Sequence, residues 1–157
     1  MTAPWVPVTV CQRWVYGVLS GDATVVSEIG GVDHIYPNIS PADVKSRHMT
    51  HAFTGPEGGQ RVLPLGAGTV QVGLRWDITA WEPDWSQQAL EPAMLAAQAA
   101  LVGTDTRGRG FRYVDGGRVF HIETLYGGPV QVPLEATPAG IWAPISERYE
   151  VTIRPLT

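Results

Sequence analysis

The sequence has a single cysteine, Cys11, among its 157 residues. A lone cysteine excludes an intrachain disulfide framework and a zinc site built from several cysteines. The chain also lacks an apolar run of the ~18–20 residues that a membrane-spanning helix needs, because Gly, Pro or charged residues interrupt each candidate. Its first residues show no basic start followed by an apolar segment, so no secretory signal is expected.

Positive charge is scarce as well. The chain carries 11 Lys+Arg against 15 Asp+Glu, a formal charge of −4, so it offers no broad basic face for sequence-independent DNA binding. Hydrophobic residues make up 44% and charged residues 17%, a mixture typical of a soluble domain with a real core. One domain usually takes ~100–200 residues, so we expect a single domain over residues 1–157.

Glycine, proline and tryptophan are plentiful. The 18 Gly and 13 Pro exceed the usual ~12% share of these two residues and cluster between periodic stretches, which indicates turns and long loops. The six Trp are many for this length, and Trp is enriched both in cores and at interfaces.

Helical signals occur in two regions. Val10, Trp14, Val18 and Leu19 recur at helical spacing, and this predicts a helix over 8–19, with a capping box at its start. The capping box pairs Thr9 with Gln12, Asp22 can cap a short second helix that ends before Gly30 and Gly31, and Leu90, Met94, Ala97 and Leu101 form the apolar stripe of a later helix. Pro92 leaves two possibilities for that later helix: a late start near Ala89, or a start at an Asp84 cap with a bend.

The remaining periodic segments predict strands. Residues 70–80 alternate apolar and polar side chains, which predicts a strand with one face on the core. Shorter strands are expected over 34–36, 48–54, 61–65, 111–114, 118–126 and 147–154, with loops over 38–45, 55–59, 66–68 and 127–144. This order favours an α+β fold: a mostly antiparallel sheet with two main helices packed on one face, and long Gly/Pro-rich loops.

No group of residues forms a catalytic pattern. His48 and His51 point to opposite faces if they lie on a strand, and without a third ligand they predict partly exposed histidines at a sheet edge rather than a metal site. Cys11 is expected to be a small buried hydrophobe. Asp77, Glu82 and Asp84 form an acidic cluster in which Asp84 is explained as a helix cap. No catalytic, cofactor-binding or metal-binding residue is therefore predicted, and no cofactor.

Two elements could contact partners. The Gly-rich segment 103–110 carries Arg107 and Arg109, with Arg112 just beyond it, but it lacks the ending of a phosphate-binding loop. A solvated turn is the simpler interpretation of this segment. Trp81 and Trp85 flank Glu-Pro-Asp and could be either interface anchors or a lid on the core.

The segments of the chain follow one another in a recognisable order. A first helix that ends in WVYGVLSGDATVVSEIGG is followed by HIYPNISP, then by the strand QVGLRWDITAW and the helix SQQALEPAMLAAQAAL. The chain closes with GGRVFHIETL and the strand RYEVTIRP. Together these segments resemble those of the tail completion and tail terminator proteins of long-tailed, double-stranded DNA phages. The resemblance covers most of the chain in element order, while the loops over 54–69 and 127–144 are longer than the family pattern.

This resemblance implies a structural protein of the virion tail or neck, assembled in the host cytoplasm, and not an enzyme. Such proteins form a ring, typically of six copies, on the last ring of the tail tube, where they end tube growth and present a surface for the head connector or stopper. Genomic DNA passes through the lumen without sequence-specific binding, and no membrane partner is implied. A ring of one domain needs two complementary patches per subunit.

We expect the contacts of such a ring at the long loops and at exposed aromatic and basic residues. The candidate interface residues are Trp81, Trp85, Arg107, Arg109, Arg112 and Trp142. Two alternatives remain open: another neck or tail component such as a stopper or tube subunit, and a small enzyme or ligand-binding domain using His48, His51 or His121. A pocket that brings a histidine within hydrogen-bond reach of a carboxylate or nucleophile would favour the enzyme.

Overall fold

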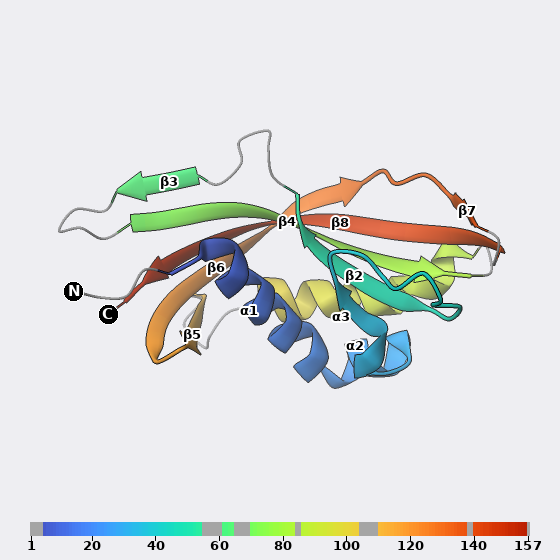
Figure 1. The fold of residues 1–157 in the computed structure, drawn as a ribbon, viewed down its shortest axis with the longest axis horizontal. Coiled ribbons are helices and arrows are strands. Elements are labelled where there is room, and N and C mark those ends of the chain that lie inside the picture. Colours follow the sequence, from blue (N-terminus) through green and yellow to red (C-terminus); the bar gives the residue numbers. More distant parts are fainter. Residues whose placement is uncertain are drawn as a thin grey trace.

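The computed structural model describes residues 5–54, 61–64, 70–83, 86–103, 110–137 and 140–156, and it has the α+β architecture expected from the sequence (Figure 1). The helices are α1 (Pro7–Gly21), α2 (Ala23–Ile29) and α3 (Glu91–Val102), with short 3-10 turns η1 (Val32–His34) and η2 (Gln87–Leu90). The strands are β1 (Ile35–Pro37), β2 (His48–Phe53), β3 (Arg61–Pro64), β4 (Val70–Glu82), β5 (Phe111–Asp115), β6 (Arg118–Val130), β7 (Glu135–Thr137) and β8 (Gly140–Pro155). No helix in the described part of the chain is long and apolar enough to cross a membrane.

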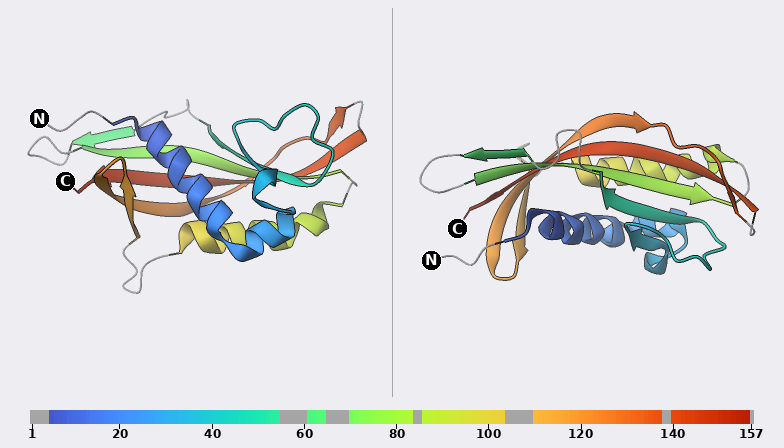
Figure 2. Two further views of the ribbon diagram at one scale, coloured as in Figure 1. Left: turned by 60° about the horizontal axis from the view of Figure 1, so that its bottom comes forward. Right: turned by 45° about the horizontal axis from the view of Figure 1, so that its top comes forward.

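The strands form one sheet in the order β1-β2-β4-β8-β6-β5. The β1–β2 pair is parallel, and the other pairs are antiparallel. The long strands β4 and β8 form the centre of the sheet. On the side of β4 away from β8, β3 pairs with its first part and β2 with its last part. On the side of β8 away from β4, β7 pairs with its first part and β6 with the rest. In the ribbon views, β4 and β8 reach beyond the helices (Figures 1 and 2).

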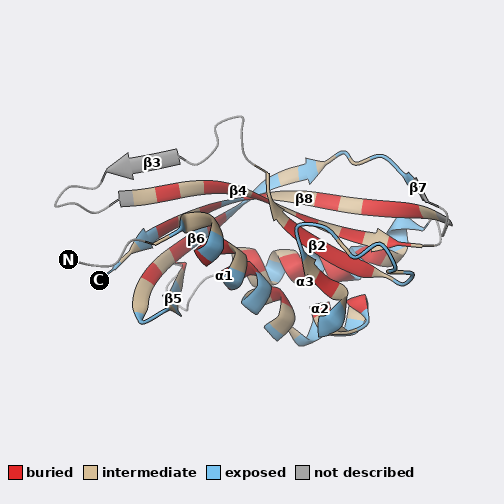
Figure 3. Ribbon diagram, in the orientation of Figure 1, coloured by how far each residue is buried: buried red, intermediate tan, exposed pale blue. Residues whose placement is uncertain are grey.

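All three helices pack on one face of this sheet. The predicted alternation of β4 is confirmed, because Val72, Leu74, Trp76, Ile78 and Ala80 are buried beneath the helices while the residues between them are less buried. The predicted apolar stripe is confirmed as well, since Leu90 at the end of η2 and Met94, Ala97 and Leu101 of α3 lie in the same core cluster. Figure 3 shows this buried layer between helices and sheet. We call this the helix face of the sheet, and the opposite side the outer face.

Local chemistry explains the helix ends. The side chain of Asp22 accepts a hydrogen bond from the backbone N–H of Val25 at 2.9 Å, as predicted for a cap. Gly30 ends α2 in a left-handed conformation, with φ of 101°. Pro92 lies in the first turn of α3, where a missing N–H costs nothing, so the late start is the alternative that the chain adopts.

Three sequence predictions are wrong. No capping box forms at Thr9 and Gln12, because α1 begins earlier, at Pro7, with Val6 as its uncapped N-cap residue. The segment 127–144 is largely strand: β6 continues to Val130, and β7 and the start of β8 follow. His48 and His51 are neither exposed nor at an edge, since β2 lies between β1 and β4 and both side chains are buried.

Candidate functional site

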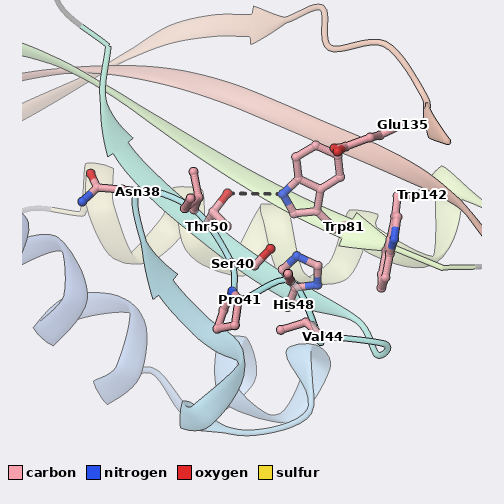
Figure 4. A pocket seen from close by; sticks show the side chains of 11 residues that line it. Asn38, Ser40, Pro41, Val44, His48, Thr50, Trp81, Glu135 and Trp142 are labelled. Atoms are coloured by element: carbon pink, nitrogen blue, oxygen red, sulfur yellow. Dashed lines mark hydrogen bonds between the residues drawn. The ribbon is translucent and has the colours of Figure 1, made fainter. Parts of the chain in front are cut away.

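The outer face of the sheet carries a pocket where β2, β4 and β8 lie side by side. Strand parity explains its floor: the buried face of β4 uses even-numbered residues, so Trp81 projects to the opposite side, and the register pairs it with His48 of β2. The pocket has a volume of about 490 Å³ (Figure 4). Its lining residues are Asn38, Ile39, Ser40, Pro41, Ala42, Val44, His48, Thr50, Trp81, Glu135 and Trp142. We call it the aromatic pocket.

Three aromatic rings are held in fixed positions in this pocket. The indole N–H of Trp81 donates to Oγ1 of Thr50 at 3.2 Å, the bond drawn in Figure 4. The ring of His48 is nearly parallel to that of Trp81, with 13° between the planes and 6.2 Å between centroids. It meets Trp142 edge-on, at 77° and 5.1 Å. Such edge-on contacts are favourable because the positive edge of one ring meets the negative face of another.

His48 is set up as a neutral acceptor. Its Nδ1 lies 3.0 Å from the carbonyl oxygen of Ser46, and a carbonyl only accepts, so Nδ1 carries the hydrogen and Nε2 is left with a lone pair. Burial lowers the pKa of His48, against the opposing effects of the Ser46 carbonyl and Glu135. The imidazole is therefore kept in its uncharged form.

The walls of the pocket come from two segments outside the central strands. After β1, Asn38 adopts φ of 66°, a left-handed conformation that Asn tolerates, and its N–H donates to the carbonyl of His51 at 2.8 Å. This turn leads into the 38–44 loop, which lies over the outer face (Figure 4). The other wall is Glu135 of β7, a strand that pairs with the beginning of β8.

The candidate interface residues separate into three groups. Trp81 and Trp142 line the same pocket, although Trp142 belongs to β8 rather than to a loop and is 7% exposed. Arg112 is exposed on β5, at the opposite edge of the sheet. Trp85, Arg107 and Arg109 lie outside the described residues.

The acidic cluster expected around the end of β4 does not form among the described residues, because its members lie on opposite faces. Asp77 is on the outer face and accepts two hydrogen bonds from Arg148, at 2.9 and 3.2 Å. Glu82 is buried on the other side and pairs with Arg47. Asp84 lies outside the described residues.

The other chemical candidates are core groups. His51 and His48 do point to opposite faces, and His51 packs against Trp76 on the helix face. Cys11 is fully buried, as expected, and burial raises the pKa of its thiol. Within the described part of the chain, no group of three or more His, Cys, Asp or Glu side chains could hold a metal ion.

The arrangement lacks the contact that would favour a histidine-based enzyme. Among the described residues, no hydrogen bond joins His48 to a carboxylate or a nucleophile. His121 does contact Glu123, with Nε2 3.0 Å from Oε1, but neither residue lines the aromatic pocket. What the pocket offers instead is a set of ring faces and acceptor atoms suited to holding a side chain.

The sequence analysis did not identify the two walls of the aromatic pocket, which are the 38–44 loop and Glu135, or Thr50 on its floor. Thr50 has the same parity as His48, so it could have been placed beside that residue from the strand pattern alone. The 38–44 segment was expected to be a loop, but its position over the sheet depends on tertiary contacts. Glu135 fell within the segment taken for a long loop, and only the pairing of β7 with β8 brings it to the pocket.

Comparison with known proteins identifies a similar fold. No protein-family model and no curated protein matches the sequence. A solved structure described as the virion of a native gene transfer agent (GTA) particle contains a chain with a similar fold, at a TM-score of 0.60 and 15% sequence identity. The match covers 96% of this chain and 99% of that chain, so the two share one fold from end to end.

Proposed function

We propose that this protein is a structural component of a phage-like particle, and that it forms a closed ring, of six copies, that caps the tail tube. The observation that carries this proposal is the fold similarity to a chain of the GTA virion over nearly the full length of both chains. The order of sequence elements, which resembles that of tail terminator proteins, supports the same role. In this role the ring ends tube elongation and provides the surface to which the head connector or stopper joins.

The shape of the sheet is compatible with a ring. A head-to-tail ring requires two different, complementary patches on each subunit. The sheet ends in β1 on one side and β5 on the other, so its two edges differ in sequence and partners. Apolar side chains are also exposed at separate places: Ile39 beside the aromatic pocket is 82% exposed, and Leu125 on the outer face of β6 is 68% exposed. Exposed apolar residues of this kind supply contact area when subunits pack.

The acidic charge suits a DNA channel. Each phosphate that a protein neutralises adds binding energy and would hinder sliding of DNA. A chain with a net charge of −4 has more acidic than basic side chains, which weakens this attraction. The lumen would therefore conduct DNA without holding it.

A tube-polymerisation assay tests this function. Purified tube protein from the same particle is polymerised with and without this protein, and tube lengths are measured by electron microscopy. A ring that caps the tube shortens the length distribution as its concentration rises, and sedimentation of the capping species gives the number of copies.

Other outcomes would overturn the proposal in identifiable ways. Tubes that incorporate the protein and grow longer would identify a tube subunit. Tubes whose lengths do not change at any ratio would rule out a cap.

A further inference from the structure

The aromatic pocket has the chemistry of a site for an organic cation. Glu135 is the one acidic side chain among its lining residues, and neither Lys nor Arg lines it. The ring faces of Trp81 and Trp142 carry the negative end of their quadrupole, which attracts cations. His48 adds an acceptor, since its Nδ1 hydrogen is engaged by Ser46. A flat guanidinium group matches both the indole faces and the carboxylate.

We propose that the aromatic pocket receives the side chain of Arg112 from a neighbouring copy of this chain. This inference rests on the proposed ring, and it names the contact that joins one subunit to the next. Charge complementarity and the positions of donor and pocket on the sheet carry it.

Arg112 is available for such a contact. Four other arginines are each paired with an acidic residue of their own chain: Arg13, Arg47, Arg75 and Arg148. Among the described residues Arg112 has no ion pair, and it is exposed on β5, a terminal strand of the sheet. In the strand register, Arg112 lies opposite His121 of β6, and His121 lies opposite Arg154 of β8. All three residues are therefore on the outer face, which also carries the pocket.

The two partners cannot meet within one chain. Across β6, Arg112 lies level with the end of β8 that holds Arg154, whereas Trp142 lies near the beginning of β8. Twelve residues of extended strand separate these ends, which corresponds to roughly 40 Å. Each copy can therefore present Arg112 to one neighbour and the pocket to another, as a head-to-tail contact requires.

A titration tests the chemistry of the pocket independently of the ring. N-acetyl-arginine methylamide is added to the Arg112→Gln variant, in which no neighbouring Arg112 competes, and the indole N–H signals of the tryptophans are followed by NMR. We expect saturable shifts of the Trp81 and Trp142 signals, and none with the uncharged citrulline analogue. Glu135→Gln should weaken binding about fivefold, as for one partly exposed charge pair, while Glu123→Gln on the same face should not change it. Equal shifts with both probes, or none, would overturn the proposal.

An assembly experiment tests the source of the arginine. Arg112→Gln and Glu135→Gln should each lower the yield of rings on tail tubes, and the exchange Arg112→Glu with Glu135→Arg should restore it. Arg154→Gln is the matched control, because it removes an exposed arginine from an inner strand of the same face. Wild-type rings that Arg112→Gln leaves unchanged would overturn this contact but not the ring. A wild-type protein that forms no ring would refute the proposed function, and the titration would still decide the pocket chemistry.

Discussion

The indole N–H of Trp76 donates to Nδ1 of His51 in the core, at 3.3 Å. An indole nitrogen can only donate, so His51 must accept at Nδ1 and carry its hydrogen on Nε2. That Nε2 is buried and has no partner among the described residues. The bond between two residues of adjacent strands thus fixes His51 in one neutral form, beneath Tyr16 of α1.

This relationship predicts a loss of stability in mild acid. Burial lowers the pKa of His51 from 6.5 to about 4. Between these two pH values His51 is protonated in the unfolded chain but neutral in the folded chain. The free energy of unfolding therefore falls as the pH drops from about 6.5 to about 4, and His51 alone accounts for a fall of about 3 kcal/mol. Urea unfolding across this range measures the effect. His51→Gln, which can still accept from Trp76, should flatten the pH dependence, and an unchanged slope would contradict this account.

The ion pair between the buried Glu82 and the part-buried Arg47 predicts an asymmetric cost of mutation. Arg47 joins the start of β2 to the end of β4 through Glu82, and its Nη1 also donates to the carbonyl of Glu28 at 3.0 Å. Arg47→Met leaves a buried carboxylate without its partner and should lower the free energy of unfolding by about 3 kcal/mol, the lower end of the range for buried pairs because Arg47 is 30% exposed. Glu82→Gln keeps an acceptor in place and should cost about 1–2 kcal/mol. Denaturant unfolding of both variants measures which substitution costs more. A larger loss in Glu82→Gln than in Arg47→Met would contradict this account of the ion pair.

Two neighbouring residues of α3 provide a packing test with an internal control. Met94 is 2% exposed in the core, whereas Leu95 on the next position is 66% exposed. Met94→Ala should lower the free energy of unfolding by about 2–5 kcal/mol, because it leaves a cavity. Leu95→Ala should change it by less than about 0.5 kcal/mol. Comparable losses in the two variants would mean that α3 presents a different face to the sheet.

Two glycines with positive φ separate steric contact from backbone strain. Gly110 has φ of 81°, and a Cβ placed there would lie 2.5 Å from the carbonyl oxygen of Ile122. Gly116 has φ of 57° at the β5–β6 turn, and a Cβ there would meet nothing within 4 Å. Gly116→Ala should cost about 1–2 kcal/mol for the left-handed conformation alone, and Gly110→Ala clearly more. Equal melting temperatures of the two variants would contradict the close approach at Gly110.

Much of the fold follows from local patterns in the sequence. The alternation of β4 and the apolar stripe of α3 could be predicted because each element buries one face, and burial of one face makes apolar residues recur with the period of the element. The cap at Asp22 is readable because the hydrogen bond spans three residues. The prediction failed where a strand contains turn-forming residues: β6 passes through Gly127, Gly128 and Pro129 by a register shift, with φ of 110° at Gly128, and then continues.

The candidate site was only partly predictable for a related reason. Parity puts His48 and Thr50 on one face of their strand, but the strand predicted over 70–80 stopped short of Trp81, so sequence analysis did not place these three residues together. Trp142 and Glu135 join them only through the pairing of β4 with β8 and of β7 with β8, contacts between residues far apart in the chain or in a segment mistaken for a loop. Local patterns carry no information on such pairings, so sequence analysis named both tryptophans without placing them together.

Locating the protein on finished tail tubes tests the central claim most directly. Gold-labelled or density-tagged protein is added to growing tubes, and its position is scored by electron microscopy. The proposed ring predicts label at a single end of each tube, in one layer, on tubes that have stopped growing. Label distributed along the tube wall, or no label on tubes at all, would contradict it.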